Sequence, residues 1–179
     1  MRVFALATAL LVSLVVAPSP GPTAKCLNPP KPLNLFQALV TRVIDGDTIH
    51  ARVKNGPSER LRLLGIDTPE IHDSAKLDRD ARQSGKSKEE IQALGRLARD
   101  FTRSRLDGKD VSLELDVQTR DTYGRLLAYV WVGGTLFNML ILREGYAQIL
   151  TIPPNVRYVE LFLECQREAL EHKRGLWSR

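Results

Sequence analysis

The 179-residue sequence predicts an α+β fold that is mainly β: a small five-stranded barrel with about three flanking helices. Short segments of alternating apolar and polar residues, bounded by glycine and asparagine, are typical of antiparallel strands. Other segments, in the middle of the chain and near its end, have apolar residues at helical spacing. Hydrophobic residues make up 43% of the chain, which is enough to bury a core in one compact domain.

The strand predictions rest on alternation and on turn residues. The five predicted strands are Ala38–Val43, Thr48–Val53, Glu59–Gly65, Val111–Val117 and Arg125–Val132. Asn55-Gly56 separates the second strand from the third and is a strong signal for the tight turn of a hairpin. Gly133-Gly134 ends the fifth strand. The first three strands therefore form a meander.

Capping residues indicate where the helices begin and end. Ser87 begins a helix that has glutamates in its first turn, and Asp107-Gly108 closes it. A short helix is predicted over Asn138–Glu144, with Asn138 as its cap and Gly145 as its stop. After a proline-containing break the last helix runs to about Arg174.

The segment before the first helix contains few apolar residues. Residues 71–87 are polar and charged, so they are expected to form a long surface loop. The resulting order β-β-β-α-β-β-α-α indicates a partly closed barrel of OB type.

The N-terminal residues predict export. Arg2 precedes an apolar segment, Val3–Ala17, whose helix would be about 22 Å long and too short to cross about 30 Å of hydrocarbon. A signal peptide is expected over residues 1–24, with cleavage after Ala17 or Ala24 left open and an uncleaved anchor as the alternative. Residues 25–34 are expected to be a proline-rich linker before a domain at 35–179. The protein is thus expected to be secreted or extracytoplasmic, without stable membrane association once the signal is removed.

The two cysteines, Cys26 and Cys165, lie too far apart in sequence for a C-x-x-C redox or zinc motif. An even number of cysteines in an exported chain permits one disulfide. The alternative is a buried Cys165 on the last helix and a free Cys26 in the linker.

The formal net charge of +5 suits a polyanionic partner such as nucleic acid, or an anionic surface, without identifying either. Charged residues also gather where predicted strands end, in the segments Ile44–Thr48, Arg62–Glu70 and Asp121–Arg125. Each segment alone is explained by an ordinary turn. Together they supply two arginines, three acids that could share a metal ion and one further carboxylate, which is what phosphodiester hydrolysis requires.

These segments read I-D-G-D-T, R-L-L-x-I-D-T-P-E and D-x-Y-G-R-x-L-A-Y, and G-L-W-S stands near the end of the chain. In order and spacing they resemble the staphylococcal nuclease (thermonuclease) family, over Leu39 to Ser178. The resemblance implies a calcium-dependent nuclease, expected as a monomer, that hydrolyses phosphodiester bonds of DNA and/or RNA. The alternative is a non-catalytic nucleic-acid-binding module on the same OB fold.

The resemblance also implies the metal site. Asp47 and Asp67 correspond to the family's metal-binding carboxylates, and Thr68 to a carbonyl ligand. Asp45 is expected close by, contacting the ion through water. Oxygen ligands alone favour Ca²⁺ over zinc.

The resemblance implies the remaining roles as well. Glu70 corresponds to the proposed general base, and Arg62 and Arg125 to guanidinium groups that hold the phosphate in the transition state. Tyr123 is expected to contact the substrate. All three residues that would carry catalysis are present, which favours the enzyme over the binding module.

Overall fold

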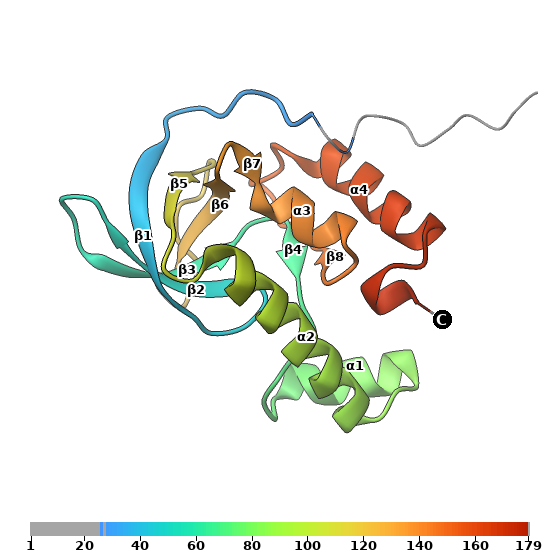
Figure 1. The fold of residues 1–179 in the computed structure, drawn as a ribbon. Helices are drawn as coiled ribbons and strands as arrows, with labels where there is room; N and C mark the ends of the chain where they lie inside the picture. Colours follow the sequence, from blue (N-terminus) through green and yellow to red (C-terminus); the bar gives the residue numbers. More distant parts are fainter. Residues whose placement is uncertain (1–25, 27, 179) are drawn as a thin grey trace, which may run out of the picture.

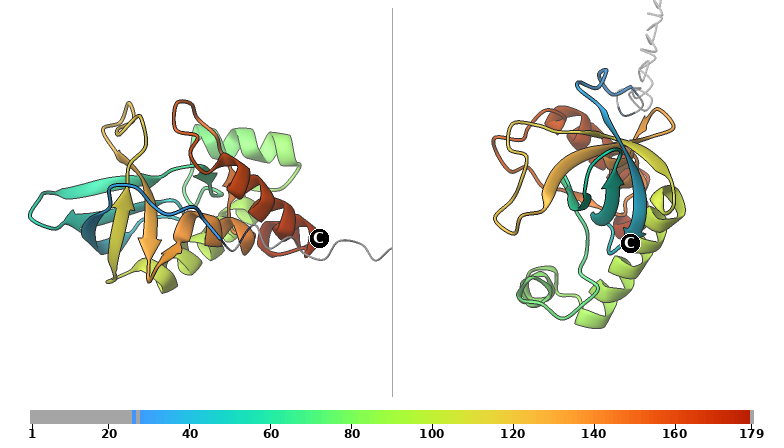
Figure 2. Two further views of the ribbon diagram at one scale, coloured as in Figure 1. Left: turned by 90° about the horizontal axis from the view of Figure 1, so that it is seen from above. Right: turned by 90° about the vertical axis from the view of Figure 1, so that its left-hand side faces the viewer.

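The computed structural model describes Cys26 and residues 28–178. Five strands form a closed barrel (Figures 1 and 2). They are β1 (Phe36–Val43), β2 (Thr48–Val53), β3 (Ser58–Leu63), β5 (Asp110–Glu114) and β6 (Leu126–Val132). Neighbours are antiparallel in the order β3-β2-β1-β5-β6, and a parallel pairing of β3 with β6 closes the ring. The predicted five-stranded barrel and its fold class are confirmed.

Three short strands extend this framework. They are β4 (Ile66–Asp67), β7 (Thr135–Leu136) and β8 (Gln148–Ile149). The first pairs with the last in a separate ladder, in which Asp67 faces Gln148. This ladder continues the chain from β3 toward the charged residues that follow it.

The strand pattern explains the barrel interior. Alternate residues of β1 and β2, such as Val40 and Ala51, are buried while their neighbours are more exposed. Strand β6 is apolar and buried along almost its whole length. A strand that is buried on both faces loses the alternation seen in half-exposed strands. Helix α3 contacts β6, which is consistent with this burial.

Within the described residues, four α-helices and a 3₁₀ helix flank the barrel. They are α1 (Ala75–Ser84), α2 (Lys88–Leu106), α3 (Phe137–Arg143), α4 (Val159–Glu171) and the 3₁₀ helix η2 (Gly175–Trp177). Helices α3 and α4 pack against each other. Helix α2 extends from the barrel and carries α1 beside its far part, so that α1 stands at one end of the molecule (Figures 1 and 2).

Three helix predictions need correction. Residues 71–87 are not only a loop, because they contain α1. The Ser74 hydroxyl caps this helix by accepting a hydrogen bond from the Leu77 amide at 3.1 Å. Leu77 is the one fully buried residue of α1, so no apolar stripe marked the helix. The last helix is shorter than predicted, ending at Glu171, and η2 follows it.

Asn138 was predicted to cap a helix and instead lies within α3, fully buried. Its Oδ1 accepts from the Val130 amide at 2.9 Å, and its Nδ2 donates to the Leu64 carbonyl at 2.8 Å. The side chain therefore joins β6 to the end of β3. A buried amide needs such partners.

The N-terminal part of the described chain lies against the domain. A disulfide joins Cys26 to Cys165 of α4, with the two Cα atoms 5.0 Å apart. The Leu33 amide donates to Oε1 of the fully buried Glu114 at 2.9 Å. Glu114 is further held by Trp131 and Tyr158 through its Oε2. Among Cys26 and residues 28–178, no helix has both the length and the apolar character needed to cross a membrane.

Candidate active site

The acidic turn between β1 and β2 is held by its own backbone. The amides of Ile44 and Asp45 both donate to the Thr48 carbonyl, at 3.0 and 3.3 Å. Oδ1 of Asp45 accepts the Asp47 amide at 3.1 Å. A Cβ atom on Gly46 would lie 2.6 Å from the methyl group of Thr68, so glycine lets the turn approach the segment after β4.

Helix α2 supports both acidic segments of the site. The Thr102 hydroxyl donates to the Gly46 carbonyl at 2.8 Å. A Cβ atom on Gly95 would lie 2.6 Å from the Pro69 carbonyl oxygen and 2.7 Å from that of Glu70. The helix therefore fixes the Asp45–Asp47 turn and the backbone that carries Glu70 relative to each other.

Asp47 is almost fully buried at the base of the site. Its Oδ2 accepts the Thr68 amide at 2.9 Å and the Thr68 hydroxyl at 3.1 Å. Its Oδ1 accepts the Thr48 hydroxyl at 3.1 Å. These contacts hold the Asp47 carboxylate against Thr68, whose backbone carbonyl is another expected metal donor.

Arg62, from the end of β3, lies between two carboxylates. Its Nη1 is 3.2 Å from Oδ2 of Asp47, and its Nη2 donates to Oδ1 of Asp67 at 3.1 Å. Nη1 also donates to the carbonyls of Leu63 and Ile66, at 3.0 and 2.8 Å. This guanidinium therefore both compensates acidic charge and supports the turn from β3 to β4.

Arg125 is positioned by Asp121. Its Nε donates to Oδ2 of Asp121 at 2.7 Å, while Oδ1 of Asp121 accepts the backbone amides of Tyr123 and Arg125. The guanidinium carbon lies 5.5 Å from the centre of the Tyr123 ring. The tyrosine itself is 84% exposed, so its ring is free to meet a ligand.

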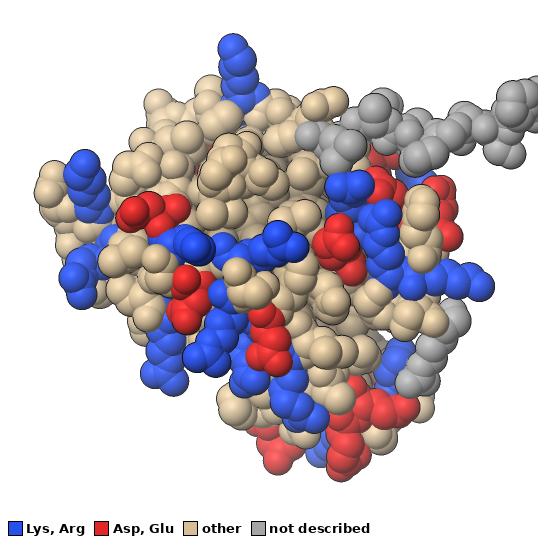
Figure 3. Space-filling model, in the orientation of Figure 1, with Lys and Arg blue, Asp and Glu red and all other residues tan. Residues whose placement is uncertain are grey.

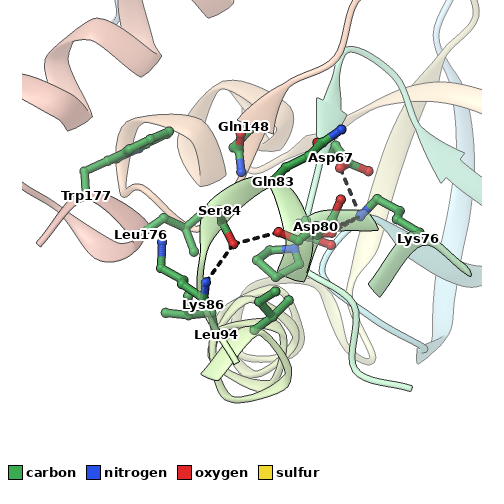
Figure 4. A pocket seen from close by; sticks show the side chains of 13 residues that line it. Asp67, Lys76, Asp80, Gln83, Ser84, Lys86, Leu94, Gln148, Leu176 and Trp177 are labelled. Atoms are coloured by element: carbon green, nitrogen blue, oxygen red, sulfur yellow. Dashed lines mark hydrogen bonds and ion pairs between the residues drawn. The ribbon is translucent and has the colours of Figure 1, made fainter. Parts of the chain in front are cut away.

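Lys76, on the first turn of α1, was not among the predicted site residues. Its Nζ lies 3.1 Å from Oδ2 of Asp67 (Figure 4). The same Nζ lies 3.0 Å from the Thr68 carbonyl oxygen and 3.3 Å from Oε1 of Glu70. Oδ2 of Asp80 lies at 3.4 Å. The one available signal was the i,i+4 spacing of Lys76 and Asp80, which is significant only if the segment is helical.

All the residues predicted for metal binding, catalysis and substrate contact line one cleft of about 510 Å³. They are Asp45, Asp47, Arg62, Asp67, Thr68, Glu70, Tyr123 and Arg125. Lys76, Arg60 and Arg79 line it too, and sequence reasoning missed them. The cleft thus combines carboxylates with several cations, an arrangement suited to an anionic ligand held through a metal ion and guanidinium groups.

Two aspartates of this cleft, Asp45 and Asp67, have raised pKa values. Burial raises the pKa of Asp45 to about 7, and the nearby charge of Asp47 adds to the rise. Burial also raises the pKa of Asp67, although the positive charges of Lys76 and Arg62 oppose the shift. Burial by itself would lower the pKa of Lys76, but Asp67, Glu70 and Asp80 outweigh it and raise that pKa. Carboxylates collected in a buried place favour an added cation.

An Asp45→Asn variant tests this electrostatic arrangement. Between pH 3.8 and about 7 the folded state keeps a proton on Asp45 that the unfolded chain has lost, so this group lowers the free energy of unfolding as the pH rises. As the pH rises from about 4 to about 8, the free energy of unfolding of metal-free Asp45→Asn should increase by about 1 to 3 kcal/mol relative to that of the wild type. Chemical denaturation in chelator measures the difference.

The matched control is Asp100→Asn, the same change at an exposed aspartate of α2. Its stability relative to the wild type should be almost independent of pH. If the stability difference between Asp45→Asn and the wild type did not change with pH, the result would contradict the raised pKa of Asp45.

Known proteins resemble this chain over most of its length. Residues 60–179 match the model of the family described as staphylococcal nuclease homologue. The chain belongs to this family. It is 40% identical to the thermonuclease of Staphylococcus intermedius over 141 residues, which covers 79% of this chain and 76% of that protein. The thermonuclease of Staphylococcus hyicus is also 40% identical, with 78% of this chain and 74% of that protein covered.

Family members from another genus are more distant. Endonuclease YncB of Bacillus subtilis is 33% identical over 147 residues, which covers 81% of this chain and 63% of that protein. Membership of the staphylococcal nuclease family confirms the predicted enzyme class, a phosphodiester hydrolase.

Within the described part of this family member, no group of three or more His, Cys, Asp or Glu side chains is placed to hold a metal ion. The predicted donors are instead two carboxylates, Asp47 and Asp67, and the carbonyl of Thr68. These oxygen donors fit a hard cation. A positive charge already occupies part of the site, because the ammonium group of Lys76 contacts Asp67 and the Thr68 carbonyl. A site with so few protein ligands leaves room for water and substrate oxygens.

Proposed function

We propose that this protein is a secreted, calcium-dependent nuclease that hydrolyses phosphodiester bonds of DNA and/or RNA. The observation that carries the proposal is that Arg62, Arg125 and Glu70 line one cleft together with the acidic residues Asp47 and Asp67. Family membership supports the nuclease activity. The oxygen-only donor set supports calcium.

Calcium would be held by Asp47, Asp67 and the Thr68 carbonyl, with Asp45 contacting it through water. When bound, the ion supplies Lewis-acid stabilisation to a non-bridging phosphate oxygen. Asp47 cannot turn away easily, because the amide and hydroxyl of Thr68 hold its Oδ2. The ligand set is therefore partly pre-organised.

The chain's own residues account for the rest of the reaction. Glu70 orients the attacking water and accepts its proton. Arg125 donates to the equatorial phosphate oxygens, whose charge is greatest in the transition state. Arg62, beside Asp47 and Asp67, does the same. Tyr123 contacts the substrate beside Arg125.

A hollow of about 340 Å³ next to the cleft supports a nucleic-acid substrate. It shares Arg62, Tyr123 and Arg125 with the cleft and continues over the apolar side chains of Leu150 and Ile152. An apolar hollow beside phosphate-binding groups suits a nucleobase next to the scissile phosphate. Figure 3 also shows lysine and arginine side chains gathered over α2 and the adjoining strands, a surface suited to a long polyanion.

The rival function, a non-catalytic nucleic-acid-binding module, would not need Glu70 in the cleft beside the metal donors. Secretion is supported by the apolar segment Val3–Ala17, which lies outside the described residues together with the proposed cleavage sites. We propose that the mature protein acts as a monomer outside the cytoplasm. The linker and domain boundaries at 25–34 and 35–179 belong to the same proposal.

Incubation of the purified protein with single-stranded DNA tests the proposal. We expect cleavage in calcium and loss of at least about 100-fold of the rate in excess chelator, because one catalytic electrostatic contact contributes about that factor. Restoring calcium should restore the rate. Undiminished cleavage in chelator would contradict the metal requirement, and binding of DNA without any cleavage would favour the rival module.

A further inference from the structure

We propose that Lys76 is a built-in competitor for the metal site, and that a divalent cation binds only by displacing the Lys76 ammonium group from Asp67 and Thr68. The inference rests on the proposed calcium-dependent function and concerns how the chain itself regulates that site. It makes α1, the helix that the sequence did not reveal, part of the metal site.

The contacts of Lys76 are those of a bound cation. Its Nζ is 3.0 Å from the Thr68 carbonyl oxygen and 3.1 Å from Oδ2 of Asp67, which are two of the three expected metal donors. It is also 3.3 Å from Oε1 of Glu70, the expected base. One ammonium group therefore contacts both the metal donors and the carboxylate that must meet the attacking water.

Metal and ammonium cannot both keep these contacts. Calcium takes oxygen ligands at 2.3–2.6 Å, so it needs the lone pairs of Thr68 and Asp67 to which Lys76 now donates. Two cations this close, at partly buried side chains, also repel each other. Binding of the ion must therefore displace the ammonium group.

Arg62 is not an equivalent competitor. Its Nη2 uses the other oxygen of Asp67, Oδ1. Its Nη1 lies 3.2 Å from Oδ2 of Asp47, but the carbonyls of Leu63 and Ile66 fix this group in place, and Oδ1 of Asp47 accepts its hydrogen bond from another residue. Arg62 can therefore stay when a metal ion binds. Lys76 is attached through a flexible four-carbon stem and is the cation that can leave.

The local structure offers Lys76 a second position. Oδ2 of Asp80, one turn further along α1, is already 3.4 Å from its Nζ. The displaced ammonium can keep this partner while it leaves Asp67. Leu77 is the one fully buried residue of α1, so a small shift of the helix disturbs few apolar contacts. Without metal the lysine neutralises the carboxylates, and with metal it moves to the edge of the cleft.

Two variants and one control test the inference. Lys76→Met keeps the aliphatic stem without charge, and Lys76→Gln provides a polar substitute in case the methionine variant folds poorly. Lys86→Met is the control, because Lys86 lines the pocket on the other side of Lys76 and the change in net charge is the same. Calcium chloride is titrated calorimetrically into chelator-stripped protein at constant ionic strength, and melting temperatures are measured with and without calcium.

We expect the dissociation constant for calcium to be at least about 10-fold lower in both Lys76 variants than in the wild type. Lys86→Met should differ from the wild type by less than about threefold, because salt screens a charge that does not touch the donors. Without calcium the Lys76 variants should melt below the wild type, and calcium should raise their melting temperature by more.

Wild-type affinity in both Lys76 variants, or an equal gain in Lys86→Met, would overturn the competition while leaving the calcium site intact. Absence of calcium binding by the wild type and by every variant would instead contradict the proposed calcium-dependent function, and the competition with it.

Discussion

Glu70→Gln and Arg125→Lys should each lower kcat for DNA hydrolysis by about 10²–10³, equivalent to about 2.7–4 kcal/mol of transition-state stabilisation. Glutamine keeps the size of Glu70 but cannot accept the proton of water. Lysine keeps the charge of Arg125 but loses the planar pair of donors that matches two phosphate oxygens. Steady-state kinetics in saturating calcium measures both effects.

The melting temperatures of these two variants should stay close to that of the wild type. The Glu70 side chain is about one-third exposed and that of Arg125 is 22% exposed, so neither is part of the core. Glu89→Gln and Arg96→Lys repeat the two changes at exposed positions of α2 and should leave kcat unchanged. Wild-type kcat in Glu70→Gln would contradict the proposed role of Glu70.

Arg62→Lys should behave differently, losing both kcat and stability. Its guanidinium holds two backbone carbonyls, at Leu63 and Ile66, in addition to Asp47 and Asp67. A lysine cannot satisfy four acceptors in that arrangement. Arg125 is therefore the better position for separating catalysis from folding.

Removing the disulfide should lower the free energy of unfolding by about 2–5 kcal/mol. Cys26 and Cys165 are 139 residues apart, and cross-linking across such a long loop greatly restricts the unfolded chain. The double variant Cys26→Ala/Cys165→Ala should show this loss in chemical denaturation, with kcat of the folded enzyme unchanged. Wild-type protein treated with a reductant should lose a similar amount.

The single variant Cys165→Ala, compared with the double variant, shows how much of the loss comes from breaking the disulfide and how much from also truncating Cys26. Because either change breaks the disulfide, the single variant should be destabilised almost as much as the double one. Alkylation of the native wild type should leave both sulfurs unlabelled. Two labelled thiols, or an unchanged unfolding midpoint in the double variant, would contradict a stabilising disulfide.

The barrel could be predicted from the sequence because its strands follow local rules. Alternation in Thr48–Val53 and the Asn55-Gly56 turn determine a hairpin without information from the rest of the chain. The parallel pairing of β3 with β6 could not be predicted in this way, because it joins Leu61 to Leu126 and depends on closure of the whole barrel. Helix α1 also escaped prediction, because its charged residues provide no hydrophobic period.

The candidate site also contains residues that the sequence suggested and contacts that only the folded chain reveals. Asp45, Asp47, Asp67 and Glu70 belong to short segments whose combined residue types, and whose resemblance to a known family, suggested a shared role. The structure brings them into one cleft. Lys76 reaches that cleft only because α1 folds back beside α2. The support that Gly95 gives to Glu70 likewise depends on a close approach between distant segments. Such long-range contacts leave no local pattern in a single sequence.

The position of Cys26 sets how the enzyme could be attached to a support. Cys26 bonds to α4, whereas α1 lies at the opposite end of the molecule (Figure 1). The cleft is lined in part by Ala75, Lys76 and Arg79 of α1. A protein held from its N-terminal side, by a natural anchor or on a bead, would present the cleft outward. Immobilised enzyme coupled in this orientation should therefore admit long nucleic acids from solution as freely as the unattached form does.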